Sequence, residues 1–145
     1  MGLQFLPYGV SSVTKILSLH AESDILNLLH IILERAGYEH LFTTNAETAL
    51  SILQSEKIDL FIQNLMRSDI NGCEFYNIIQ DDKELRHIPV LIVSAVNPLT
   101  YPEICFRIIQ NLYPDHYLLL PFSPRVLLST INRILSEATP QLIQH

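Results

Sequence analysis

His20 follows directly on the largely apolar run 15–19, and we single it out first as a candidate for chemistry. An imidazole in such a place can be phosphorylated, bind a transition metal or act as a pH switch. No second histidine or cysteine lies at metal-ligand spacing from His20, so no metal site is predicted. We therefore expect His20 to be hydrogen-bonded to the backbone or to Asn64, with Glu22 in the first turn of the following helix.

Asn64 and Ser94 end two further apolar runs. The Asn64 amide could bind a ligand, but such a side chain more often provides shape and hydrogen bonding without charge. Ser94 has no base near it in the sequence and is therefore not expected to be an activated nucleophile. Asp69 could serve as an acceptor, although acids in loops are usually solvated. The sequence contains no glycine-rich phosphate loop, nucleophile elbow, metal pair or triad pattern, so we do not expect an enzyme.

The composition excludes several classes of protein. A chain of 145 residues fits one domain, and 48% hydrophobic against 17% charged residues argues against disorder. The net charge of −6, with scattered lysines and arginines, disfavours nucleic acids and anionic membranes as partners. No apolar run approaches the roughly 20 residues of a membrane-spanning helix.

Cys73 and Cys105 both fall on predicted helices. Two cysteines do not make a disulfide framework for a domain of this size, so we expect their thiols to be buried or inert. Residues 1–12 lack the basic region and long apolar core of a signal peptide. A reducing, cytoplasmic location is the resulting default expectation.

The apolar pattern predicts strands alternating with helices. The predicted strands are 15–19, 41–44, 59–63, 89–93 and 117–120. The predicted helices begin at Ser23 or Asp24, at Asn45, after Gly72, at Pro102 and at Ser123-Pro124. This alternation with short connections predicts an α/β fold, a doubly wound five-stranded parallel sheet at 14–137, with a leader at 1–13 and a tail at 138–145. In such sheets the functional crevice lies beyond the carboxyl ends of the strands, where His20, Asn64, Ser94 and Leu120 would meet.

Residues 15–137 resemble response-regulator receiver domains of the CheY-like type. The motifs that carry the resemblance are Lys15-Ile16-Leu17, Ala36-Gly37-Tyr38, Asn71-Gly72, Ile88-Pro89-Val90 and Pro121-Phe122-Ser123-Pro124. The resemblance implies a flavodoxin-like (βα)5 fold with strand order 2-1-3-4-5. It also implies a place in two-component or phosphorelay signal transduction, in which Mg²⁺ and an aspartate serve phosphoryl transfer.

The sequence departs from that family where the family carries its chemistry. The family's acidic pair falls on His20 and Ala21, its acceptor aspartate on Asn64 and its lysine on Leu120, while the hydroxyl persists as Ser94. Mg²⁺ needs anionic oxygen ligands, so its binding is expected to be lost. Losing carboxylates and lysine together avoids leaving a partly buried charge without its partners. The resemblance therefore implies a degenerate pseudo-receiver.

The family also has a switch aromatic, which falls on Tyr117, and a surface that meets partners, in or near which Tyr101, Phe106 and Tyr113 fall. We expect a protein partner, namely a sensor kinase, an output domain, another signalling protein or a second copy of the chain. Two alternatives stay open. One is a phosphorelay receiver that uses Asp69 or His20 as acceptor. The other is a small-ligand or metal sensor that uses the remodelled pocket.

Overall fold

Strands and helices alternate along the computed structural model, which describes residues 13–65 and 71–138. The strands are β1 (Lys15–Leu19), β2 (Glu39–Thr43), β3 (Leu60–Gln63), β4 (Val90–Ser94) and β5 (Tyr117–Leu119). The helices are α1 (Ser23–Arg35), α2 (Ala46–Ser55), α3 (Gly72–Asp81), the 3₁₀ helix η2 (Pro98–Thr100), α4 (Phe106–Asn111) and α5 (Pro124–Ala138). The division of the chain into leader, domain and tail stays a prediction, because residues 1–12 and 139–145 lie outside the described ranges.

All strands are parallel and form one sheet in the order β2-β1-β3-β4-β5. Leu17 of β1 lies between Leu41 of β2 and Phe61 of β3, which places three apolar residues across the middle of the sheet. The predicted doubly wound sheet and its strand order are therefore confirmed. Because all strands run the same way, their carboxyl ends meet at one edge of the sheet.

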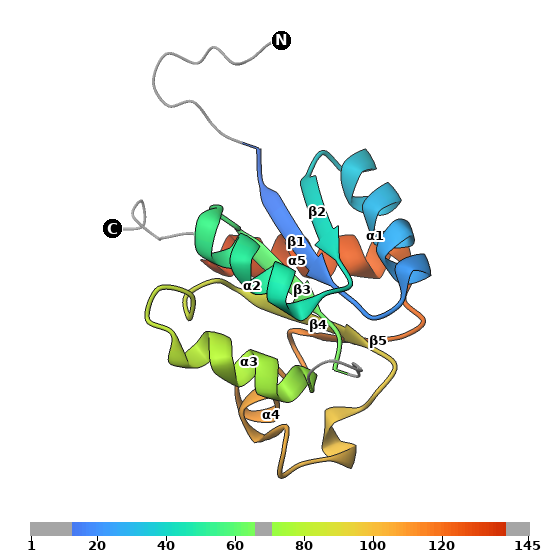
Figure 1. Ribbon diagram of the computed structural model, residues 1–145. Helices are drawn as coiled ribbons and strands as arrows, with labels where there is room; N and C mark the ends of the chain where they lie inside the picture. Colours follow the sequence, from blue (N-terminus) through green and yellow to red (C-terminus); the bar gives the residue numbers. More distant parts are fainter. Residues whose placement is uncertain (1–12, 66–70, 139–145) are drawn as a thin grey trace, which may run out of the picture.

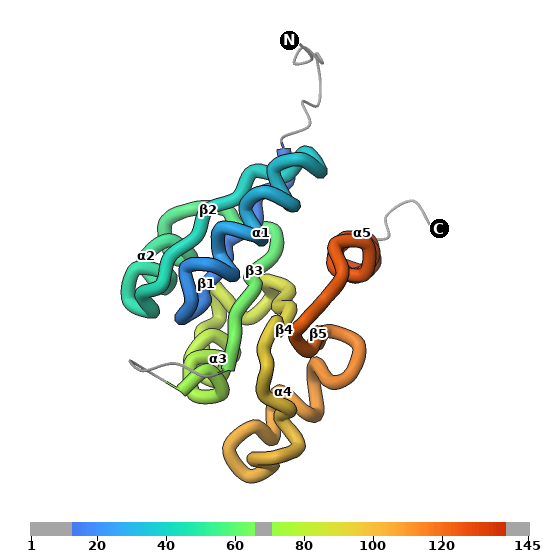
Figure 2. The backbone as a smooth tube through the Cα atoms, turned by 90° about the vertical axis from the view of Figure 1, so that its right-hand side faces the viewer, coloured from blue at the N-terminus to red at the C-terminus, as the bar shows by residue number. Residues whose placement is uncertain are grey.

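Helices cover both faces of the sheet, as Figure 1 shows with α2 and α3 in front of the strands and α5 behind them. Two apolar clusters result, one on each face. The first includes Leu53, Phe61 and Ile79, and the second includes Leu33, Ile62 and Ile131. Every residue of β3 is buried, as a central parallel strand requires. Figure 2 shows α3 beside α4, on the side of the molecule away from α1.

The fourth helix is shorter than the sequence predicts. Its prediction from Pro102 onward is wrong, because α4 begins at Phe106 and residues 101–105 form turns. Cys105 has φ −98° and ψ 20°, which lies outside regular helical geometry, so the helix does not extend backward from Phe106. The amide of Cys105 donates to the carbonyl of Tyr101 at 3.0 Å, a single i→i−4 turn that precedes the helix.

A buried histidine of β2 contacts both α1 and β1. His40 is only 5% exposed, its Nε2 lies 2.7 Å from Ser18 Oγ, and its Nδ1 lies 3.1 Å from His30 Nδ1 of α1. Its ring also lies against Phe42. Burial, and secondarily the nearby His30, lower the pKa of His40 from 6.5 to about 4. His40 is therefore neutral in the folded protein at neutral pH.

We expect the free energy of unfolding to fall as the pH is lowered from about 6.5 to about 4, because the unfolded chain then binds a proton that folded His40 does not. The full difference is about 3 kcal/mol, and it is absent above pH 6.5, where both states are neutral. Urea unfolding at pH 7.5 and 4.5 measures it. His40→Gln should lose most of this pH dependence, whereas His87→Gln, at an exposed position, should keep it. An unchanged pH dependence in His40→Gln would contradict the assignment.

Candidate functional site at the strand ends

A small cavity lies at the carboxyl ends of the strands. It has a volume of about 110 Å³ and is lined by His20, Ala21, Glu22, Asn64, Ser94, Ala95, Val96 and Leu120. The lining includes every position that the sequence analysis assigned to the degenerate phosphorylation site, from elements far apart in the chain. The parallel sheet explains this meeting, because β1, β3, β4 and β5 all end at this edge.

His20 is buried, with 3% of its surface exposed, and its Nδ1 accepts a hydrogen bond from the Glu22 amide at 3.2 Å. Because Nδ1 is the acceptor, the proton of the neutral ring is on Nε2. Glu22 itself is exposed and is the N-cap residue of α1, without a side-chain capping bond. The expectation that Glu22 lies within the first turn of the helix is therefore off by one position.

Asn64 and Ser94 lie at the ends of neighbouring strands, 4% and 2% exposed. The backbone N–H of Asn64 donates to the backbone carbonyl of Leu19 at 3.3 Å, which continues the pairing of β3 with β1. Ser94 Oγ accepts from the amides of Leu65 at 3.4 Å and Val96 at 3.2 Å. The Ser94 hydroxyl oxygen thus links the segment that follows β3 to the segment that follows β4 by accepting two backbone hydrogen bonds.

The chemistry of the lining does not fit Mg²⁺. Glu22 is the one side chain in the lining with a formal charge at neutral pH, and the positions nearest the strand ends carry an imidazole, an amide, a hydroxyl and an isobutyl group. A hard divalent cation needs several oxygen ligands, some of them anionic. Within residues 13–65 and 71–138, no group of three or more His, Cys, Asp or Glu side chains is placed to hold a metal ion. Asp69 lies outside these described ranges.

Comparisons with known proteins decide the family. A family model described as the response regulator receiver domain matches residues 16–132. The chain belongs to that family. Its fold is also that of a CheY-like receiver domain from Methanospirillum hungatei JF-1, with a TM-score of 0.76 at 24% identity, covering 88% of this chain and 97% of that one.

Two curated relatives of this receiver domain are longer proteins. The chain is 30% identical over 125 residues to the probable transcriptional regulator ycf27 of Porphyra purpurea, covering 86% of this chain and 48% of the relative. It is 31% identical over 124 residues to the alkaline phosphatase synthesis transcriptional regulatory protein PhoP of Bacillus subtilis (strain 168), covering 86% and 49%. The receiver domain thus spans about half the length of these relatives.

Tyr117, the predicted switch aromatic, is turned inward in this receiver domain. It is 7% exposed, and its hydroxyl donates to the Val96 carbonyl, in the loop that follows Ser94. Its ring meets Tyr113 edge to face, with 5.5 Å between ring centroids. Burial raises the pKa of Tyr117 above its usual value, against an opposing effect of Ser94. The phenol therefore remains a hydrogen-bond donor to the β4–α4 loop at neutral pH.

The predicted interface residues differ in exposure. Tyr101 is 49% exposed and Phe106 is 57% exposed, while Tyr113 is half-buried against Tyr117. Further exposed apolar side chains on or near α4, β5 and α5 are Leu99, Ile104, Leu119 and Val126. Within the described part of the chain, no helix is long and apolar enough to cross a membrane.

Gln63 was missed by the sequence analysis, although it is fully buried at the end of β3. Its Nε2 donates to the carbonyls of Gly72 at 2.9 Å and Asn64 at 3.3 Å. Gln63 therefore joins the end of the strand to the start of α3, whose N-cap Asn71 accepts from the amides of Cys73 and Glu74. The available signal was a carboxamide in an otherwise apolar run that was predicted to be buried on both faces.

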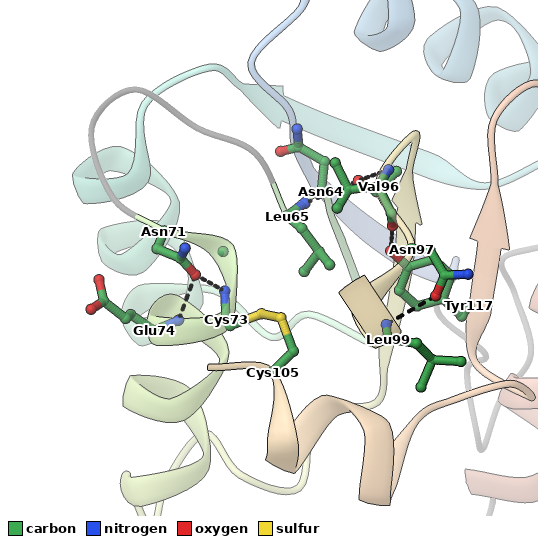
Figure 3. The surroundings of a disulfide bond; sticks show 12 residues. Asn64, Leu65, Asn71, Cys73, Glu74, Val96, Asn97, Leu99, Cys105 and Tyr117 are labelled. Atoms are coloured by element: carbon green, nitrogen blue, oxygen red, sulfur yellow. Dashed lines mark hydrogen bonds between the residues drawn. A yellow bond between two sulfur atoms is a disulfide. The ribbon is translucent and has the colours of Figure 1, made fainter. Parts of the chain in front are cut away.

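Cys73 and Cys105 form a disulfide, so the expectation of two inert thiols is wrong. Both residues are buried, as predicted, but their Cα atoms lie only 5.2 Å apart, well inside the range for a bridge. Figure 3 shows the bond between the first turn of α3 and the residue before α4. The disulfide could not be predicted from a sequence separation of 32 residues, because only the packing of α3 beside α4 brings the two cysteines together. The cytoplasmic location stays a prediction.

Proposed function

We propose that this receiver domain transmits its signal by protein contacts and does not accept a phosphoryl group. One observation carries the proposal, namely that His20, Asn64, Ser94 and Leu120 bring neither a carboxylate nor an ammonium group to the cavity. Phosphoryl transfer to a carboxylate needs that nucleophile and a cation that neutralises the phosphoryl oxygens. An asparagine amide is not such a nucleophile, and the lining offers one exposed carboxylate as a cation ligand.

The same cavity gives little support to a small-ligand sensor. Its volume of about 110 Å³ is below the usual range for small-molecule sites, roughly 300–1,000 Å³. His20 is a poor phosphorelay acceptor in this arrangement, because it is 3% exposed and its Nδ1 already accepts from a backbone amide. The proposal therefore includes no cofactor, no Mg²⁺ and no enzymatic activity.

The partner in this proposal is a protein. Tyr101 and Phe106 expose about half of their surface beside α4, and aromatic side chains are enriched at protein interfaces. A sensor kinase, an output domain, another signalling protein or a second copy of the chain would bind there, in the cytoplasm. The net charge of −6 disfavours nucleic acid or a membrane as the partner.

Intact mass after incubation with acetyl phosphate and Mg²⁺ tests the proposal. We expect no added phosphoryl mass on the parent chain, because nucleophile and metal ligands are both missing. The matched control is the variant His20→Asp/Ala21→Asp/Asn64→Asp/Leu120→Lys, which returns the family's carboxylates and lysine to the cavity. An adduct on that variant but not on the parent supports the proposal. A stoichiometric, hydroxylamine-sensitive adduct on the parent overturns it, and peptide mapping would then decide whether Asp69 is the acceptor.

A further inference from the structure

We propose that the Cys73–Cys105 disulfide is a reversible redox site that sets the position of α4, an input that stands in for phosphorylation. This inference rests on the proposed function, since it supplies a signal to a domain whose strand-end cavity has no acceptor aspartate and no lysine in its lining. The first observation is where the bond lies. Cys73 is in the first turn of α3 and Cys105 is the N-cap of α4, so the bond joins the segments that follow β3 and β4.

Those two segments also carry the residues of the cavity. Asn64 lies between β3 and α3, and Val96 lies between β4 and α4, and Figure 3 shows both residues above the disulfide. Val96 also accepts the hydroxyl hydrogen bond of Tyr117. A change in the link between Cys73 and Cys105 therefore acts on the same loops that border the cavity and that hold the switch aromatic.

The second observation is how little else holds residues 97–105. Their hydrogen bonds are local: Asn97 accepts from the amide of Leu99, and the amides of Ile104 and Cys105 both donate to Tyr101. The segment leads into α4, which has six residues and no side-chain capping bond. Several side chains here, including Leu99, Tyr101 and Ile104, are about half exposed. Few buried contacts and local hydrogen bonds characterise a segment that opens readily once a crosslink is removed.

The third observation is access to the sulfur atoms. A cavity of about 220 Å³ is lined by both cysteines together with Leu65, Asn71, Val96, Tyr101 and Ile104. The cysteines themselves are 2% and 3% exposed, so attack on a sulfur atom requires side chains that line this cavity to move. None of the lining side chains carries a formal charge, so an approaching thiolate meets no fixed negative charge in the cavity.

The chemistry is thiol–disulfide exchange with a dithiol reductant. One thiolate of the reductant attacks a cysteine sulfur, the sulfur–sulfur bond of the protein breaks, and the departing cysteine thiolate takes up a proton. The second thiol of the reductant, as its thiolate, then attacks the mixed disulfide and releases the other cysteine. Two electrons and two protons pass to the protein, which ends with two thiols, while the reductant ends as a disulfide. Glutathione disulfide re-forms the bond by the same kind of exchange: one cysteine thiolate attacks it and releases a first glutathione, and the other cysteine thiolate then attacks the mixed disulfide and releases the second.

Hydrogen exchange of the full chain tests the proposal, with one sample oxidised by glutathione disulfide and one reduced by dithiothreitol. Alkylation with N-ethylmaleimide counts the thiols in each sample. On reduction we expect amide exchange in residues 97–113 to become roughly tenfold faster or more, because the crosslink no longer limits local opening. Exchange in 23–35, on the opposite face of the sheet, should change less than twofold, and reoxidation should restore both.

The variant Cys73→Ala/Cys105→Ala should behave like the reduced parent and should not respond to dithiothreitol. If that variant does not fold, the reduced parent carries the comparison alone. Unchanged amide exchange in residues 97–113 on reduction would overturn the proposal. An equal rise of the exchange rate in residues 23–35 would overturn it too, because the bond would then stabilise the whole domain and not α4 in particular. Two alkylated thiols after oxidation would also overturn it. A phosphoryl adduct on the parent would overturn the proposed function separately, since it is read by mass and not by exchange.

Discussion

Replacing Gly72 with alanine is expected to destabilise the receiver domain by about 3–5 kcal/mol. A Cβ at this position would lie 2.4 Å from the Asn64 carbonyl oxygen, 2.6 Å from the Leu65 Cα and 2.9 Å from the Leu65 carbonyl oxygen. All three are backbone atoms, so no flexible side chain can swing away to relieve the clash. The first turn of α3 would have to move away from the end of β3.

That movement would also break hydrogen bonds. The Gly72 amide donates to the Leu65 carbonyl at 2.9 Å, and its carbonyl accepts from buried Gln63. A buried carboxamide without its partner adds its own cost, so the effect exceeds that of steric strain alone. Urea unfolding followed by circular dichroism measures the loss.

Gly37 provides the matched control for this substitution. It has φ +95° and would place a Cβ in open space, with nothing within 4 Å. Gly37→Ala is therefore expected to cost only about 1 kcal/mol, from the left-handed backbone conformation. Similar losses for the two variants, or a loss below about 1 kcal/mol for Gly72→Ala, would show that the close approach of α3 to β3 is not what requires glycine.

The sheet could be predicted from the sequence because each strand carries its own signal. The run Lys15–Leu19 is mostly apolar and is followed by the cap of a predicted helix, so both its type and its limits follow from local residues. The meeting of His20, Asn64 and Ser94 then follows from topology alone, because parallel strands end at one edge. Local pattern and a general rule of α/β sheets were sufficient here.

The features that were missed depend on how helices pack. Nothing near Cys105 in the sequence points to Cys73, and their pairing exists only because α4 lies beside α3. The late start of α4 has the same origin, since Pro102 is a good first-turn residue but Cys105 is held outside helical geometry. The His30–His40–Ser18 contacts likewise join residues from three elements, and each residue alone has an ordinary place in its own pattern.

Replacing Asn64 with aspartate is expected to destabilise the domain by about 3 kcal/mol at pH 7, although this restores the residue typical of the family. Asn64 is 4% exposed, and the cavity lining holds no lysine or arginine that could pair with a carboxylate. Burial raises the pKa of a carboxyl group there, so the folded state binds the proton more tightly than the unfolded chain does. Relative to the parent, the loss should therefore shrink as the pH is lowered toward 4.

A second substitution separates unpaired charge from a change of shape. Leu120→Lys added to Asn64→Asp should recover about 1–2 kcal/mol, because the new ammonium group enters the same cavity as the carboxylate.

Asn71→Asp is the control for the chemical change itself. Asn71 is the N-cap of α3, where its side chain accepts from two amides and a negative charge is favourable, so its substitution should alter stability by less than about 0.5 kcal/mol. Urea unfolding of the parent, Asn64→Asp, Leu120→Lys and the double variant gives the coupling between positions 64 and 120. Zero coupling, or an Asn64→Asp loss as small as that of Asn71→Asp, would mean that the cavity tolerates charge and that asparagine and leucine were not exchanged together for electrostatic reasons.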